Sequence, residues 1–189
     1  MFDGFLRVAA ATPDIRVADC NFNGASAAAL VSEAYEQGVS LLVLPELCLT
    51  GYTCSDLFLQ ESLLDGAGKA LLTLTEATRD KNMVVLAGLP LTVNGVLYNV
   101  AAVLHDGDIL GFVPKSYLPT YSEFYEGRHY HSGADIETDV LFNGRTYPFG
   151  TRLLFRCRQM PAFTLGIEIC EDLWVAQPPS ISHALAGAT

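Results

Sequence analysis

Three residues of this chain have side chains that could together cleave an amide bond. Glu46 lies in the stretch VLPELCLTGY, Lys115 in GFVPKSYLP and Cys170 in GIEICEDLW. A cysteine enzyme that breaks amides needs a nucleophile, a base that accepts the thiol proton, and positive charge where the oxyanion develops. Cys170 can be the nucleophile, Glu46 the base and Lys115 the positive charge. The backbone N–H of Glu171 could be a second donor to the oxyanion.

Each of these residues also has a simpler interpretation, which we favour when it is taken singly. A glutamate at a strand end often caps a helix or faces water, and a lysine in a proline-flanked loop usually faces water. A cysteine on an apolar strand usually belongs to the core. The carboxylates after Cys170 also work against reactivity, because negative neighbours raise the pKa of a thiol. We expect Lys115 to offset this acidity if the three residues meet, which spacing alone does not prove.

Strands that alternate with helices would position these residues. Hydrophobic runs predict strands over 5–11, 39–46, 83–90 and 163–169. Helical spacing predicts helices over 21–37, from about Asp56 with Ser55 as its cap, over about 68–80, and after Pro179. Hairpins are predicted at Asp106-Gly107 and near Asn143-Gly144, and 116–133 reads as a loop region. This order predicts an α/β layered fold with mixed sheets, in which chemistry gathers on the loops after strands.

Composition narrows the class of protein. The chain has 189 residues, half of them hydrophobic, which is enough for the core of one domain over 1–189. Its net charge of −10 argues against binding to nucleic acid or to anionic lipid. No run of 18 apolar residues predicts a membrane span, and the start lacks the basic-then-apolar order of a signal peptide.

The cysteines and histidines predict no metal site. Five cysteines without a CxxC pair make a disulfide framework and a zinc site improbable, and a reducing cytoplasm fits best. The four histidines are expected at the surface, without a third ligand that would complete a metal site.

Taken in order, the three blocks LPELCLTGY, PKSYLP and EICED resemble the nitrilase, or carbon–nitrogen hydrolase, superfamily, which has a Glu–Lys–Cys triad. The resemblance covers the whole chain. It implies an α-β-β-α four-layer sandwich, with Glu46 as general base, Lys115 as oxyanion stabiliser and Cys170 as nucleophile.

A narrower resemblance is carried by GYTCSDLF, by KSYLPTYSEFYEGRHYHSG and by CEDLW. These stretches are similar to the amino-terminal glutaminase domains of glutamine-dependent NAD⁺ synthetases. The resemblance implies that the side-chain amide of glutamine is hydrolysed through a Cys170 thioester. The ammonia would then amidate nicotinate adenine dinucleotide in a carboxy-terminal synthetase domain that uses ATP and Mg²⁺.

The same resemblance suggests further site residues. Tyr52 and Tyr121 would line the glutamine pocket, and plain packing is an equally good explanation for both. Glu171 would help to orient the substrate ammonium or the ammonia, although a solvated carboxylate at a helix start is the simpler reading.

The resemblance also implies that parts are missing. The family sandwich continues beyond HALAGAT into further strands, so we expect an incomplete domain with uncovered apolar surface and little activity of its own. No Gly-rich phosphate loop followed by lysine and no SGG loop occurs in the sequence, so the synthetase domain is absent and no cofactor is expected here. Relatives of this kind commonly form homo-oligomers.

Two other hypotheses stay open. The chain could be another amidase of the superfamily that acts on a small amide. It could also be a non-catalytic scaffold module with Cys170 in a dry core, and a wide separation of Cys170 from both Glu46 and Lys115 would favour that reading.

Overall fold

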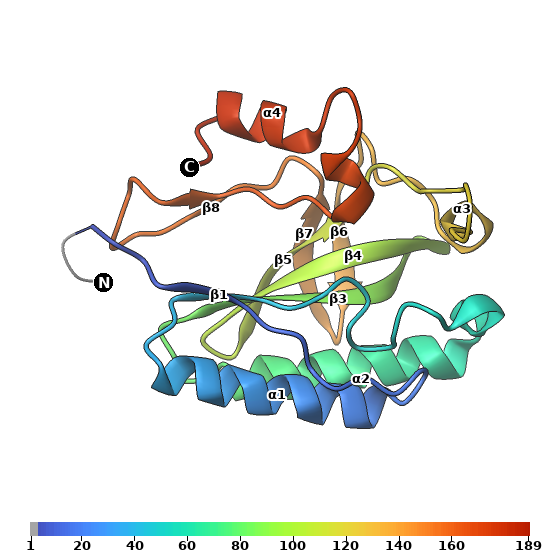
Figure 1. The fold of residues 1–189 in the computed structure, drawn as a ribbon, viewed down its shortest axis with the longest axis horizontal. Helices are drawn as coiled ribbons and strands as arrows, with labels where there is room; N and C mark the ends of the chain where they lie inside the picture. Colours follow the sequence, from blue (N-terminus) through green and yellow to red (C-terminus); the bar gives the residue numbers. More distant parts are fainter. Residues whose placement is uncertain (1–3) are drawn as a thin grey trace.

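The computed structural model describes residues 4–189, and over this range seven strands form one mixed sheet (Figure 1). The strand order is β1-β2-β3-β4-β5-β7-β6. The strands are β1 (Val8–Ala10), β2 (Leu41–Val43), β3 (Val84–Val93), β4 (Val96–His105), β5 (Asp108–Pro114), β6 (Glu137–Phe142) and β7 (Arg145–Gly150). β1, β2 and β3 run parallel, whereas β3, β4 and β5 form antiparallel pairs. The fold class predicted from the sequence, a nitrilase-like mixed α/β fold, is confirmed.

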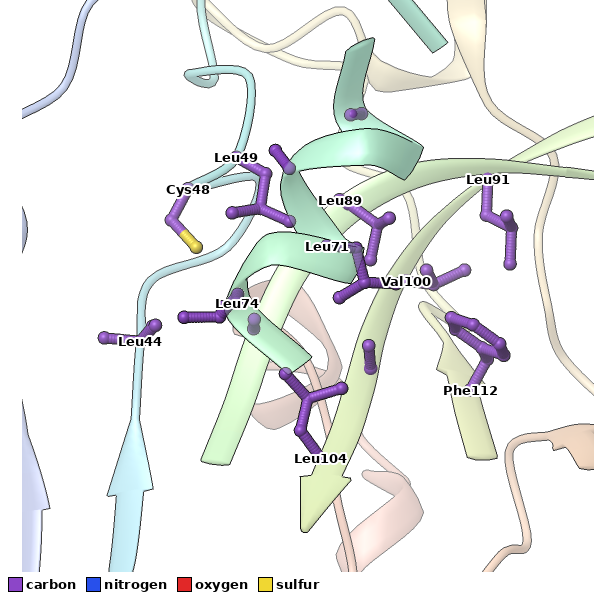
Figure 2. Close-up of a cluster of buried hydrophobic side chains, with 14 of the residues drawn as sticks. Leu44, Cys48, Leu49, Leu71, Leu74, Leu89, Leu91, Val100, Leu104 and Phe112 are labelled. Atoms are coloured by element: carbon purple, nitrogen blue, oxygen red, sulfur yellow. The ribbon is translucent and has the colours of Figure 1, made fainter. Parts of the chain in front are cut away.

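Two long helices cover one face of this sheet. They are α1 (Cys20–Glu36), whose first turn is capped by the Asp19 carboxylate at the Phe22 N–H, and α2 (Glu61–Ala77). Figure 2 shows Leu71 and Leu74 of α2 packed over Leu89 of β3 and Leu104 of β4. Burial of this apolar surface is the main source of the stability that holds the strands in register.

The start of α2 differs from the prediction. The sequence predicts a helix from about Gly68, but α2 begins seven residues earlier, at Glu61. Glycines at 66 and 68 weaken the helical pattern, yet Gly66 lies where an added Cβ would be 3.2 Å from the Cys20 sulfur. The small residue therefore lets α1 and α2 approach closely, and tertiary packing outweighs its low helix propensity. The helix expected from Asp56 is only the short 3-10 helix η1 (Ser55–Leu59), and Ser55 makes no cap bond.

Three tight hairpins join neighbouring strands: β3 to β4, β4 to β5, and β6 to β7. Asp106-Gly107 and Asn143-Gly144 were predicted, and Asn94-Gly95 between β3 and β4 was missed. In all three turns both residues have positive φ, between 47° and 79°. This left-handed geometry suits Asn, Asp and Gly, and it matches the twist of the flanking strands. Asn94-Gly95, between LTV and VLY, carries the same sequence signal as the two predicted turns.

The other face of the sheet carries the last third of the chain. A two-stranded ribbon of β8 (Phe155–Arg156) and β9 (Thr164–Leu165) lies between the large sheet and α4 (Pro179–Leu185), so the layers follow an α-β-β-α order (Figure 1). A smaller apolar cluster, which includes Val103, Val113 and Ile169, lies on this face.

Three expectations for strands and histidines are corrected. The strand predicted over 163–169 is reduced to two residues, because the segment pairs only with β8 and then turns toward Cys170. The strands predicted over 5–11 and 39–46 shrink to the three residues that pair in parallel. His183 is buried rather than at the surface, since its Nε2 lies 2.7 Å from the Thr151 carbonyl oxygen.

Candidate active site

Glu46 and Lys115 meet at the ends of two strands that are not neighbours in the sheet. Glu46 follows β2 and Lys115 follows β5, and the Lys115 ammonium donates to Glu46 Oε1 at 2.7 Å. Asn99, in the middle of β4, joins the two segments. Its side chain donates to Glu46 Oε1 at 2.6 Å, and its carbonyl accepts the Lys115 backbone N–H at 2.8 Å. The strand between them therefore fixes both groups.

A second carboxylate completes the surroundings of Lys115. Glu126 begins the short helix α3 (Glu126–His129), and its Oε1 accepts from the Lys115 ammonium at 2.7 Å. The Tyr52 hydroxyl donates to the same oxygen, also at 2.7 Å. Neither Glu126 nor Asn99 was predicted from the sequence. Asn99 could have been suspected as a lone amide in an apolar strand, whereas nothing in EFYEGRH distinguishes Glu126 from its neighbours.

The electrostatics keep this buried lysine charged. Lys115 is 1% exposed. Burial on its own would lower the pKa of Lys115, but the charge of Glu46 and the hydrogen bonds to both glutamates raise it above its ordinary value. For Glu126, burial is the larger effect and raises the pKa of the carboxyl, while Lys115 opposes the rise. The group is thus a compact ion cluster with one cation between two carboxyls.

Cys170 stands beside this cluster, at the first residue of the 3-10 helix η2 (Cys170–Leu173). Its φ of 46° lies in the left-handed region, which a residue other than glycine adopts only when its surroundings hold it there. Cys170 is exposed as a residue, but the protein around its thiol removes part of the water from the sulfur. The thiol lies within electrostatic range of Glu46, Lys115 and Glu126, so the chain brings the three predicted groups together.

The state of the thiol bears on one expectation from the sequence. Burial raises the pKa of Cys170, the charge of Glu46 raises it further, and Lys115 only opposes this rise. Lys115 lowers the pKa of Cys170, in the direction predicted from the sequence, but burial and the charge of Glu46 outweigh it. A protonated thiol beside a carboxylate is an arrangement that needs a base during the reaction, not a preformed thiolate.

Tyr121 and Glu171 form a pair next to the thiol. The Tyr121 hydroxyl donates to Glu171 Oε2 at 2.9 Å. This hydrogen bond and the nearby charges of Glu171 and Cys170 raise the pKa of Tyr121. Tyr52 reaches the site differently: burial and its bond to Glu126 raise the pKa of its hydroxyl, with smaller effects of Glu46 and Cys170. All six candidate residues from the sequence therefore lie in one region, around the Cys170 thiol. Their roles stay predictions.

The loop that contains α3 is also held by hydrogen bonds at the surface of the protein. Arg128 donates two hydrogen bonds to the Asp56 carboxylate on η1, at 2.8 and 2.9 Å. These bonds hold the pKa of Asp56 well below its usual range. The segment after Glu46 thus contacts α3 twice, through Tyr52 and through Asp56, and both contacts keep Glu126 near Lys115.

Other chemistry is not evident in the described part of the chain. Among residues 4–189 no cluster of three His, Cys, Asp or Glu side chains could hold a metal ion. No helix within this range is long and apolar enough to cross a membrane. A cavity of about 280 Å³ lies between β9 and α4, where Glu168, Ser180 and His183 contribute to its lining, and Glu46, Lys115 and Cys170 do not.

Comparison with known proteins identifies the family to which this chain belongs. The family model described as Carbon-nitrogen hydrolase matches residues 7–189. A "Glutamine-dependent NAD(+) synthetase" of Mycobacterium tuberculosis is 45% identical over 186 residues, and that of Mycobacterium leprae is 41% identical over 186 residues. Each alignment covers 98% of this chain but only 27% of the relative, so the chain spans about a quarter of the length of these proteins.

Solved structures agree with the sequence comparison. The crystal structure of a glutamine-dependent NAD⁺ synthetase from Cytophaga hutchinsonii has a TM-score of 0.85 and 30% identity, over 97% of this chain and 29% of that one. A carbon–nitrogen hydrolase from Helicobacter pylori has a TM-score of 0.68 at 20% identity, over 97% of this chain and 57% of that one, which shows a shared fold alone. The chain belongs to the carbon–nitrogen hydrolase family, and its sequence is homologous to part of the glutamine-dependent NAD⁺ synthetases.

Proposed function

We propose that this chain is a glutaminase, which hydrolyses the side-chain amide of glutamine and releases ammonia. The observation that carries the proposal is the buried Lys115, bound to Glu46 and Glu126 beside the Cys170 thiol. A buried cation between two carboxyls is costly to maintain for stability alone, because its desolvation penalty is large. Glutamine as the substrate is supported by the names of the relatives, which are glutamine-dependent enzymes.

The first half of the reaction forms a thioester. Glu46 takes the proton from the Cys170 thiol as the sulfur attacks the amide carbon, so that the raised thiol pKa is overcome within the attack itself. Negative charge then develops on the amide oxygen. The Lys115 ammonium and the backbone N–H of Glu171 stabilise it. Glu46 returns its proton to the leaving nitrogen, ammonia departs, and a γ-glutamyl thioester remains on Cys170.

The second half releases glutamate. A water molecule gives a proton to Glu46 and its oxygen attacks the thioester carbon, with the oxyanion in the same position as before. When the carbon–sulfur bond breaks, the proton passes from Glu46 to the sulfur. The products are the free thiol and the γ-carboxylic acid of glutamate, which loses its proton to the solvent or to the released ammonia, so that protons and bonds balance over the cycle.

Substrate recognition is assigned to the residues at the edge of the site. Glu171 presents a carboxylate whose Oε2 is held by the Tyr121 hydroxyl, and a fixed negative group suits the α-ammonium of glutamine. Tyr52 is bound to Glu126, so its ring forms a wall of the pocket rather than a mobile side chain.

The released ammonia would serve a longer protein. We propose that a synthetase domain of a longer polypeptide uses the ammonia to amidate nicotinate adenine dinucleotide to NAD⁺, in the cytoplasm and within a homo-oligomer. This proposal is supported by the name of the relatives, glutamine-dependent NAD⁺ synthetases, of whose length this chain spans about a quarter. ATP and Mg²⁺ would act in that domain. No step in this chain is assigned to them.

The test is ammonia release from glutamine by a Cys170→Ala variant of the intact protein. We expect the rate to fall by at least about a thousandfold, because the nucleophile is lost while the fold is kept. Cys157→Ala is the matched control, since Cys157 is a partly exposed cysteine outside the site. Undiminished release by Cys170→Ala would refute the proposal. Hydrolysis of a simple aliphatic amide, with glutamine left intact, would instead identify another amidase.

A further inference from the structure

The Asp172 carboxylate, two residues after Cys170, is buried beneath the site. It is 1% exposed and sits on η2. Its Oδ2 accepts the Ile169 backbone N–H at 3.1 Å. That bond is the usual link from the third residue of a helix back to its cap residue, and it explains only part of what Asp172 contacts.

The remaining bonds of Asp172 reach a different segment. Its Oδ1 accepts the backbone N–H groups of Ser116 at 3.1 Å and Tyr117 at 2.8 Å, and Oδ2 lies 3.3 Å from the Ser116 nitrogen. Ser116 and Tyr117 follow directly after Lys115. One carboxylate therefore ties the residue before the nucleophile to the two residues after the lysine.

This bridge joins the segments of Lys115 and Cys170, which lie 55 residues apart in the sequence. Glu46 and Lys115 are joined through Asn99. The segment of Cys170 is joined to the residues after Lys115 by the buried bonds of Asp172 to Ser116 and Tyr117, and at the exposed edge of the site by the bond from Tyr121 to Glu171. Cys170 also has left-handed backbone geometry, which must be held by its surroundings. Burial raises the pKa of Asp172, and the three backbone N–H groups oppose this rise, as expected if they stabilise the ionised form.

We propose that Asp172 is a positioning residue, whose bonds to the backbone after Lys115 set the distance between the Lys115 ammonium and the Cys170 sulfur. The inference rests on the proposed function for its catalytic consequence, but not for its geometry. Asp172 itself touches no reacting atom.

The substitution Asp172→Asn tests the bridge at nearly constant volume. An amide accepts through one oxygen only, so the variant loses its bonds either to the Lys115 segment or to Ile169, and its NH₂ group then faces a backbone N–H. Either outcome loosens the bridge. Glu168→Gln is the matched control: Glu168 lies two residues before Cys170 and accepts the Ser180 N–H at 3.0 Å, but it does not contact the Lys115 segment.

The first measurement is the rate of iodoacetamide alkylation at Cys170 against pH, with the site located by peptide mass spectrometry. The charged and titratable groups around the thiol are Glu46, Lys115 and Glu126, together with Tyr52 and the Tyr121–Glu171 pair. Removal of the Asp172 charge alone would lower the alkylation midpoint, because one nearby anion is lost. Displacement of Lys115 raises the alkylation midpoint, because the cation that stabilises the thiolate moves away while Glu46 stays on its own loop. We expect a higher midpoint in Asp172→Asn and an unchanged midpoint in Glu168→Gln.

The second measurement is ammonia release from glutamine. We expect kcat to fall about a hundredfold with a smaller change in KM, which is the scale of effect for a misplacement of about 1 Å. Ser132→Ala serves if Asp172→Asn does not fold, because the Ser132 hydroxyl holds the Ser116 carbonyl at 2.6 Å from the other side of the same segment. It should change both readouts in the same direction, to a smaller extent.

An alkylation midpoint that stays equal or falls in Asp172→Asn would overturn the positioning role. A decrease in turnover that only follows the loss of folded protein would overturn it too. If the unmodified protein releases no ammonia from glutamine but the midpoint still rises in Asp172→Asn, the proposed function fails and the positioning role stands.

Discussion

Lys115 is the residue on which the charges of the site depend. It donates to Glu46 and to Glu126, each at 2.7 Å. The nearby thiol has a raised pKa, so the resting site holds a protonated sulfur and an ionised lysine. Proton transfer to Glu46 is then part of the attack on the substrate.

The substitution Glu46→Gln should separate thiol ionisation from catalysis. The charge of Glu46 raises the pKa of Cys170, so its removal should shift the alkylation midpoint of Cys170 to lower pH. Ammonia release should nevertheless fall by about a hundredfold or more, because a general base is lost. Alkylation kinetics and turnover measured on the same sample check this. Retained turnover would show that Glu46 is not the base, and a midpoint that moves upward would show that its charge does not raise the thiol pKa.

The substitution Lys115→Met should leave the buried Glu126 carboxyl and the partly buried Glu46 carboxyl without their cation. Breaking a buried ion pair in this way costs about 3–5 kcal/mol of unfolding free energy at neutral pH. The Glu126 pKa is already raised in the folded chain. A raised carboxyl pKa means that stability is greatest below the unfolded pKa and is lost as pH rises through the folded pKa.

The instability of Lys115→Met should therefore diminish as the solution is acidified toward the ordinary glutamate pKa of about 4.3. Urea unfolding at several pH values measures it, with the unmodified protein as reference. A loss of stability that does not depend on pH would indicate a packing defect instead of uncompensated charge.

Residue types alone were enough to select the three candidate groups, and not enough to find their supports. Glu46, Lys115 and Cys170 each follow a strand-like run, and their types make a complete set for amide cleavage. Asn99 and Asp172 act through contacts between segments that lie far apart in the sequence. Their importance depends on register and on loop geometry, which no local pattern records.

At the scale of elements, the loop after β2 rests directly on β3. An added Cβ at Gly88 of β3 would lie 2.8 Å from the Cα and from the carbonyl carbon of Glu46. Both are backbone atoms that cannot rotate away. The absence of a side chain at residue 88 is therefore what allows Glu46 to reach Lys115.

The substitution Gly88→Ala should displace Glu46 and reduce ammonia release by roughly a hundredfold, as for other misplacements of about 1 Å. Gly68→Ala is the control, because an added Cβ there meets only ordinary contacts with Phe142 at 3.5 Å and longer. In the interior of α2 that change should raise the unfolding free energy by about 0.5–1 kcal/mol. Full activity of Gly88→Ala would show that the loop position is not critical.

The elements themselves were predictable where a strong local signal exists. α1 ends at Glu36, just before the predicted stop at Gly38, and the Asp-Gly and Asn-Gly hairpins at 106 and 143 are confirmed. The errors arise where packing decides. The strand lengths of β1 and β2 depend on parallel partners, and the start of α2 depends on its close approach to α1 at Gly66.

At the scale of the whole molecule, the layers place the chemistry on loops beside a rigid sheet. The larger core lies between the sheet and the helices α1 and α2, and the smaller cluster lies under β8 and β9 (Figure 1). Glu46, Lys115 and Cys170 come from three separate loops, so their separation depends on the entire sheet being folded. Layer order could be anticipated from the resemblance, but the two-residue lengths of β8 and β9 could not.

The most direct test of the account uses a glutamine analogue that carries a chloroketone in place of the side-chain amide. The intact protein is labelled to completion, the modified peptide is identified, and ammonia release is measured on the same sample. We predict one label per chain, on Cys170, slowed by glutamine and accompanied by complete loss of ammonia release. Labelling of another residue, or ammonia release that persists in fully labelled protein, would contradict the claim that this sulfur attacks the amide carbon.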